Sequence, residues 1–176
     1  MKNLFYVVLM ALVLSSCQKQ KIGFVDNGEV INEYQKKKDV EADFQVKQEA
    51  FTKRADSISQ AFQAEAQSTQ TEAQRLAKSN NLKKAEEMMG GLQQKQQMLQ
   101  QQMQYEQQQL TQLFQSQIDS VIVDVKDFVK EYGKANGYTY ILGTSDSAAS
   151  VLYGTDENDL SDTILDALNA KYEEVE

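Results

Sequence analysis

Apolar residues recur every three or four positions through most of residues 39–136, and short β-prone segments flank that stretch. The chain has no proline, and the glycines within 39–136 are Gly90, Gly91 and Gly133. Because little else there interrupts an i to i−4 hydrogen-bond ladder, the abundance of Gln, Ala, Glu and Lys predicts long helix. The flanking segments can pair only if this helix folds back on itself. The pattern therefore predicts an α+β fold, with a small β-containing head and a long antiparallel coiled-coil hairpin.

Each expected arm of the hairpin carries an apolar stripe. The stripe of the outgoing arm includes Phe44, Ile58 and Phe62 and weakens before residue 79. More than half of the residues from Gln93 to Gln117 are glutamine, so this part of the return arm is expected to be solvated helix rather than globular core. The apolar residues of the return arm as a whole follow a degraded heptad. The members of that stripe are Leu82, Ala85, Met89, Leu92, Leu99, Met103, Leu110 and Leu113.

Two places could reverse the helix. Ser79-Asn80-Asn81 has turn chemistry, because Asn tolerates the left-handed conformation and both residue types bond to nearby backbone. Gly90-Gly91 is the alternative. We favour a turn near 79–81, which leaves roughly forty residues on each side for the arms, each about 60 Å long at 1.5 Å per residue. The glycine pair is then expected to be a hinge in the return arm.

The head is expected to form from residues 17–38 and 137–176, as three short strands and two short helices. Asn27 is expected to cap the first helix and Asp159 the second, while Gly133 and Asn136-Gly137 are expected to end the return arm. A sheet of three short strands has unpaired edges, so oligomerisation is expected. The β-prone segments are 21–26, 138–143 and 150–153.

The first seventeen residues have the layout of an export signal. Leu4 to Leu14 is an apolar run too short to span a bilayer but suited to a signal peptide. It ends in Leu14-Ser15-Ser16-Cys17, which resembles the lipobox of bacterial lipoproteins. Residues 1–16 are therefore predicted to be a lipoprotein signal peptide and Cys17 to be the lipidated residue. The alternative is an ordinary secretory signal with an incidental cysteine.

Lipidation implies a periplasmic protein that is anchored to a membrane. Cys17 is the only cysteine, so an intrachain disulfide is excluded. Gln18, directly after it, resembles the sorting pattern that favours the outer membrane over the inner. Two or more acyl chains would make the anchoring essentially permanent.

Composition gives no support to an enzyme. The chain has no histidine, no phosphate-binding glycine loop and no plausible metal cluster, so no cofactor, no metal and no nucleic-acid partner are expected. The net charge is −8, and the acidic residues are concentrated after residue 145. Four carboxylates share a helix face, where we interpret them as solvated rather than catalytic. They are Asp119, Asp124, Asp127 and Glu131.

Three stretches of the chain follow the pattern of one known family: Lys21 to Asp26, Phe51-Thr52-Lys53-Arg54, and Tyr138 to Glu176. In their order and spacing they resemble the Skp/OmpH family of periplasmic chaperones. The resemblance implies a homotrimer whose heads associate through their strands. It also implies an ATP-independent holdase that binds unfolded outer-membrane β-barrel proteins in a cavity between coiled-coil arms. Lipid anchoring and the acidic net charge depart from the soluble, often basic-armed members.

Several arm residues are candidates for client binding. Met88 and Met98 fall off the heptad stripe, where flexible thioethers suit promiscuous contacts, whereas Met89 and Met103 are expected to fill the stripe. Phe62 and Tyr105 are further candidates. A basic tip is expected to attract acidic clients or anionic lipid, although a solvated helix turn explains it equally well. It comprises Arg75, Lys78, Lys83 and Lys84.

Two other classes of function fit parts of the pattern. A structural coiled-coil lipoprotein would space or tether layers of the cell envelope, but it predicts a regular heptad, which Gln96, Glu106 and Gln117 interrupt. An adaptor of a secretion or efflux assembly would dock its hairpin tip on a partner. Such adaptors usually carry additional β domains beside the hairpin, and this chain has no room for them.

Overall fold

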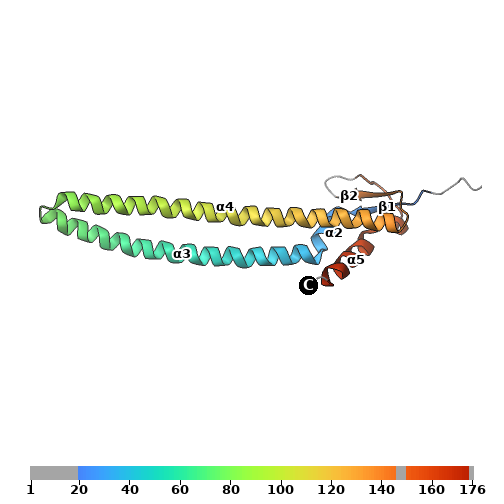
Figure 1. Ribbon diagram of the computed structural model, residues 1–176, viewed down its shortest axis with the longest axis horizontal. Coiled ribbons are helices and arrows are strands. Elements are labelled where there is room, and N and C mark those ends of the chain that lie inside the picture. Colours follow the sequence, from blue (N-terminus) through green and yellow to red (C-terminus); the bar gives the residue numbers. More distant parts are fainter. Residues whose placement is uncertain (1–19, 146–149, 175–176) are drawn as a thin grey trace, which may run out of the picture. The chain divides into compact units, whose positions relative to one another are not determined.

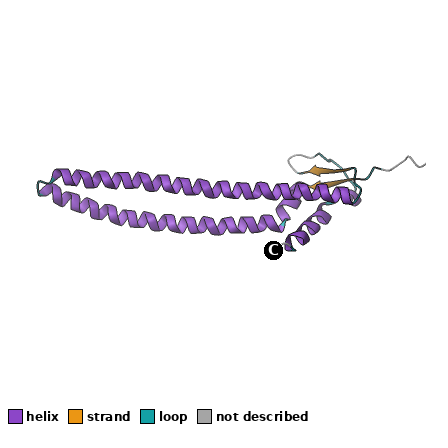
Figure 2. Cartoon of the chain, viewed as in Figure 1, coloured by secondary structure: helices purple, strands orange, loops and turns teal. Residues whose placement is uncertain are grey.

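The computed structural model describes residues 20–145 and 150–174, and the predicted signal peptide and Cys17 lie outside this part. Figure 2 shows that most of the described chain is helical. The elements are β1 (Ile22–Asp26), α2 (Asn27–Glu33), α3 (Gln35–Lys78), α4 (Leu82–Ala135), β2 (Tyr140–Thr144), the 3-10 helix η1 (Asp156–Asn158) and α5 (Ser161–Glu173). Figure 1 labels all of them except η1.

The chain divides into two compact units. The arm unit is Lys37–Ser120, and the head unit consists of the described residues before Lys37 together with those after Ser120. The head unit therefore takes in the last part of α4 as well as the expected strands and short helices. No helix of the described residues is both long enough and apolar enough to cross a membrane.

In the arm unit α3 and α4 form an antiparallel hairpin (Figure 1), which confirms the predicted helical hairpin. Phe44 stacks on Phe114 with ring centroids 4.2 Å apart. At the other end of the unit Leu76 and Ala85 share one buried cluster. As the residue number rises along α3, the number of its partner on α4 falls, which is the pairing of two antiparallel helices.

The turn between the arms comprises Ser79, Asn80 and Asn81. The Ser79 hydroxyl donates to the Arg75 carbonyl over 2.8 Å, and the Asn81 amide donates to the Leu76 carbonyl over 2.9 Å. Asn80 adopts φ 65°, a left-handed conformation that Asn tolerates better than most residues. Gly90 and Gly91, the alternative site for the turn, lie inside the continuous helix α4.

In the head unit β1 and β2 pair in parallel, from Ile22 opposite Tyr140 to Asp26 opposite Thr144. The Lys21 carbonyl faces β2, where it accepts from the Thr139 amide over 2.8 Å. On the opposite edge of β1, Phe24 forms a single parallel bridge with Asp159. Both edges of β1 are therefore occupied, one by β2 and the other by the bridge residue.

The prediction of a third strand at residues 150–153 is wrong. The described sheet has two strands, and this segment is irregular. Leu152 is 91% exposed and Tyr153 is 85% exposed, so neither side chain is packed against another element of the described chain. Strand preference reflects packing on a half-buried surface, and the segment finds no such surface within one chain.

The cap of α2 lies one residue earlier than predicted. The Asp26 carboxylate, rather than the Asn27 side chain, accepts from the Gly28 and Glu29 amides over 2.8 and 3.0 Å. Asp26 is the last residue of β1, and its own amide donates to the Ser161 hydroxyl over 2.9 Å. A cap chosen from helix pattern alone could not anticipate that the strand end supplies the carboxylate.

Helix α5 packs into the core of the head unit. The Asp159 carboxylate accepts from the Ser161 amide and hydroxyl over 2.9 and 2.7 Å, just before the helix starts. Ile164 is fully buried and Leu168 is 2% exposed. Asn169 accepts from the Gln35 amide over 2.9 Å, so a side chain of α5 supplies the cap for the first turn of α3.

The return arm ends in a glycine motif, as its sequence predicts. Gly137 adopts φ 71°, and the Tyr138 amide donates to the Gly133 carbonyl over 2.9 Å. This is the pattern of a helix that ends on a left-handed residue. It turns the chain directly from α4 into β2. Fully or almost fully buried side chains of the head include Val25, Val30, Val121, Val125, Ile164 and Leu168.

We predict that Leu168→Ala lowers the free energy of unfolding by about 2–4 kcal/mol, because it leaves a cavity in the head core. Leu152→Ala is the matched control, since the same atoms are removed from a side chain that is 91% exposed. The control is expected to change stability by less than about 0.5 kcal/mol. Urea denaturation followed by circular dichroism measures both. Equal effects of the two substitutions would contradict the assignment of the core.

Candidate functional site

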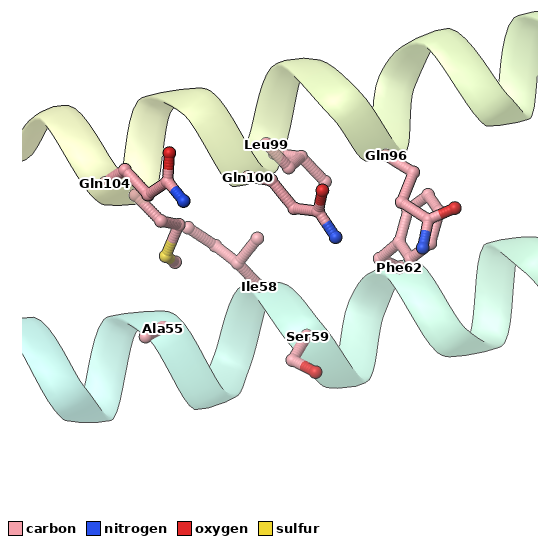
Figure 3. A pocket seen from close by; sticks show the side chains of 9 residues that line it. Ala55, Ile58, Ser59, Phe62, Gln96, Leu99, Gln100 and Gln104 are labelled. Carbon is pink, nitrogen blue, oxygen red and sulfur yellow. The ribbon is translucent and has the colours of Figure 1, made fainter.

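A groove opens between α3 and α4 within the arm unit (Figure 3), with a volume of about 600 Å³. We call it the arm groove. Its lining residues come from two turns of α3 and slightly more than two turns of α4. They are Ala55, Ile58, Ser59 and Phe62 on α3, and Gln96, Leu99, Gln100, Met103 and Gln104 on α4.

The arm groove has an apolar floor and a polar rim. Ile58 and Phe62 on α3 are four residues apart, as are Leu99 and Met103 on α4, and this spacing puts each pair on one helix face. All four side chains are half-buried, whereas the glutamines of the rim are exposed. Figure 3 shows Ile58 pointing toward α4 and the Gln100 amide projecting into the space between the two helices. Apolar contacts and hydrogen bonds are therefore available side by side.

Two ion pairs link the helices on either side of the arm groove. Arg54 pairs with Glu106, and Lys95 pairs with Glu65. Partly exposed ion pairs contribute little stability, typically about 0–1 kcal/mol each. Within each pair the two charges nevertheless neutralise each other, and the side chains that line the groove between the pairs are uncharged.

The predicted client-binding residues lie in three different environments of the arm unit. Phe62 lines the arm groove. Met98 is 60% exposed and Tyr105 is 63% exposed, and neither lines the groove. Met88 packs against the buried tip cluster of Ala73, Leu76 and Ala85.

The predicted phase of the heptad stripe is wrong near the turn. Met89, expected in the stripe, is 42% exposed, and Leu82 is 58% exposed. Ala85 and Met88, three residues apart, face α3 there instead of Ala85 and Met89, four residues apart. Both spacings are compatible with a heptad, so only the packing against α3 decides between them. Leu113, also expected in the stripe, is 46% exposed.

At the basic tip one cation is already paired. Arg75 binds Glu72 through two hydrogen bonds of 2.8 and 2.6 Å. The hydrogen bond from Arg75, together with the charges of Arg75 and Lys84, holds the pKa of the Glu72 carboxyl below its usual value. Lys78, Lys83 and Lys84 are exposed, and the charge of Lys84 also acts on Glu72.

The predicted hinge lies in regular helix. A side chain added at Gly90 or Gly91 would meet nothing within 4 Å. Close packing therefore does not explain these glycines, and their role as a hinge stays a prediction.

The predicted carboxylate face lies partly in ion pairs. Asp124 pairs with Lys36, and Glu131 pairs with Lys171 at 3.4 Å. The Asp119 carboxylate accepts a hydrogen bond from the side-chain amide of Gln115 over 3.1 Å. Among residues 20–145 and 150–174, no group of three or more potential ligands could hold a metal ion.

These ion pairs border a second cavity of about 280 Å³ in the head unit, against Tyr34, Phe128 and Tyr172. Tyr34 is 5% exposed and meets Tyr172 edge to face, with ring centroids 5.9 Å apart. Burial, and then the nearby Asp124 charge, raise the pKa of the Tyr34 phenol above its ordinary value. The phenol is therefore held in its neutral form.

We predict that Tyr34 contributes to loss of stability at alkaline pH. In the unfolded chain the phenol ionises with a pKa near 10, before it ionises in the folded protein, so stability is present below pH 10 and is lost as the pH rises through the folded-state pKa. Tyr34→Phe removes this contribution. Urea denaturation between pH 8 and pH 11 should show a shallower alkaline loss in this variant than in the wild type. Tyr153→Phe, at an 85% exposed position, is the control and should behave like the wild type.

A comparison with protein families matches most of the described chain. The family model described as outer membrane protein (OmpH-like) matches residues 21–168. The match extends from just before β1 into α5 and includes both arms of the hairpin. No curated protein matches the chain.

Proposed function

The chain belongs to the OmpH-like family of outer membrane proteins, and from this membership we propose that it is a periplasmic chaperone of outer-membrane proteins. The family consists of chaperones rather than enzymes. More specifically, we propose an ATP-independent holdase that keeps unfolded β-barrel proteins from aggregating. A cavity between coiled-coil arms is the proposed place of binding.

The observation that carries the proposal is the dispersed apolar surface of the arm unit. Met98 and Tyr105 are exposed single sites, and the arm groove adds a half-buried patch that is open to a partner. Glutamine separates these sites along α4. Many weak contacts over a long surface hold an unfolded chain without the ordering cost of one fixed complex. Binding of this kind needs no nucleotide hydrolysis.

We further propose that the protein is a homotrimer assembled through its head units. Support comes from the apolar side chains exposed around the small sheet. Ile22 and Leu142 are each 42% exposed, and Tyr140 is 58% exposed. Two-stranded sheets are marginal alone, and exposed apolar surface of this kind favours association.

We also propose that the lipidated Cys17 attaches the protein to a membrane, and that this membrane is the outer rather than the inner one. We predict that cells making the wild-type protein incorporate a labelled fatty acid into it and that Cys17→Ser abolishes the label, because the thiol is the acylated group. Ser16→Ala is the control and should keep the label, since a small residue still precedes the cysteine. Labelling of the Cys17→Ser variant would contradict the lipobox assignment.

The test of holdase function is light scattering by an unfolded outer-membrane β-barrel protein diluted from urea, without ATP. The wild type should suppress scattering, and the double variant Met98→Ser with Tyr105→Ser should require roughly three-fold or more protein, because two exposed apolar contacts are lost. Both side chains are more than half exposed, so the fold should be retained. The control replaces Gln101 and Gln108, exposed on the same helix, with Ser.

Absence of suppression by the wild type would contradict the holdase and favour the structural coiled-coil lipoprotein. Equal loss in the glutamine control would show that Met98 and Tyr105 are not the contact sites. Sizing of the protein in the same buffer tests the trimer separately, and a monomer would contradict it.

A further inference from the structure

We propose that the arm groove binds an extended, uncharged segment of the client that carries apolar side chains at every second residue. The proposal rests on the holdase function and specifies what one hairpin recognises. It assigns a site between the two helices of a single chain, in addition to any cavity formed between copies.

The floor of the arm groove matches one face of such a segment. Ile58, Leu99 and Met103 present half-buried apolar surface to the open side. In an extended chain alternate side chains point to the same face, so a segment of alternating pattern turns a continuous apolar face to this floor. Its polar face would remain in water. Met103 adds a flexible thioether that adapts to side chains of different shape.

The rim of the arm groove matches the backbone of the same segment. Gln96, Gln100 and Gln104 follow one another at intervals of four residues on α4, which corresponds to about 6 Å per step. Alternate residues of a strand are about 6.5 Å apart, and they direct their backbone groups to the same edge. Each glutamine amide can both donate and accept, as a backbone edge requires. Recognition through backbone groups is independent of the client's sequence.

Charge favours an uncharged occupant. On one side of the groove the charges of Arg54 and Glu106 cancel, and on the other side those of Lys95 and Glu65 do so. The lining residues between them are apolar or neutral, so a charged client side chain on the floor would lose water without gaining a partner. Membrane-spanning strands of β-barrel proteins have an alternating pattern with an apolar, uncharged face.

The dimensions select a short strand over a helix. The distance from Gln96 to Gln104 along α4 is about 12 Å, which corresponds to roughly four residues of extended chain. A helix with its side chains is about 10–12 Å across and already satisfies its own backbone groups, so it could not use the glutamine amides. A short extended segment leaves its backbone groups open to them. Contact with about four residues at a time also keeps the binding weak and reversible.

The test measures binding of two fluorescein-labelled nonapeptides to the full chain by fluorescence anisotropy. One peptide alternates threonine and leucine, beginning and ending with threonine, and the other has the same composition with its four leucines at i, i+3, i+4 and i+7, which puts them on one face of a helix. The wild type should bind the alternating peptide at least about five-fold more tightly. The triple variant Gln96→Ala, Gln100→Ala and Gln104→Ala should bind it roughly ten-fold more weakly, because hydrogen bonds to the backbone are lost.

The matched control replaces three other exposed glutamines of α4, which do not line the groove, with alanine: Gln94, Gln101 and Gln108. Alanine is the best helix former, so both triple variants should retain their helicity, which circular dichroism checks. Equal binding of the two peptides, unchanged binding by the groove variant, or equal weakening by both variants would each overturn the proposal.

Light scattering with an unfolded β-barrel protein separates this inference from the function on which it rests. Peptide selectivity that depends on Gln96, Gln100 and Gln104 supports the groove assignment even if the protein fails to suppress aggregation, and that failure would overturn the holdase. Suppression without such selectivity leaves the holdase supported and overturns the groove assignment.

Discussion

The parallel pairing of β1 with β2 is the constraint on which the rest of the chain depends. Residues 22–26 and 140–144 lie more than a hundred positions apart, yet they are hydrogen-bonded along their whole length. Everything between them must leave the head and return. With no proline in the sequence, two long helices joined by a short turn satisfy that condition. Asp26 strengthens the junction, because its carboxylate caps α2 while its amide bonds Ser161 at the start of α5.

Because the head contains most of the buried apolar core, the arms can have a more polar composition than the head. Apolar burial in the head is concentrated in residues such as Val25, Val121 and Ile164, whereas much of the arm surface is exposed and rich in glutamine. The arm helices meet at Phe44 with Phe114 and at the tip cluster, and the arm groove opens elsewhere in the same unit. An incompletely filled seam between two helices costs stability, but it retains apolar surface for a partner. This is the feature that links the fold to the proposed chaperone function.

Sequence reasoning was most reliable where a local chemical rule acts alone. The helical hairpin follows from composition and spacing, the end of α4 follows from Gly137, and the turn at Ser79 to Asn81 coincides with residues that tolerate left-handed backbone. It was unreliable where a partner distant in sequence decides. Residues 150–153 have strand preference but find no sheet to join, and Met88 rather than Met89 packs inward because α3 selects between two permitted spacings. Of the client-binding candidates, only Phe62 lines the arm groove.

What the sequence determined by itself is therefore the helical hairpin, its turn, the two strands that pair and the membership of a family, because helix content, turn residues and strand preference are properties of neighbouring residues. What only the tertiary structure decided is which faces meet. The parallel register of β1 and β2, the cap that Asn169 provides to α3, and the juxtaposition of Ile58 with Leu99 and Gln100 depend on contacts across long separations. Such contacts form only after the helices have packed, and small differences in helix phase decide which side chains remain open to a client.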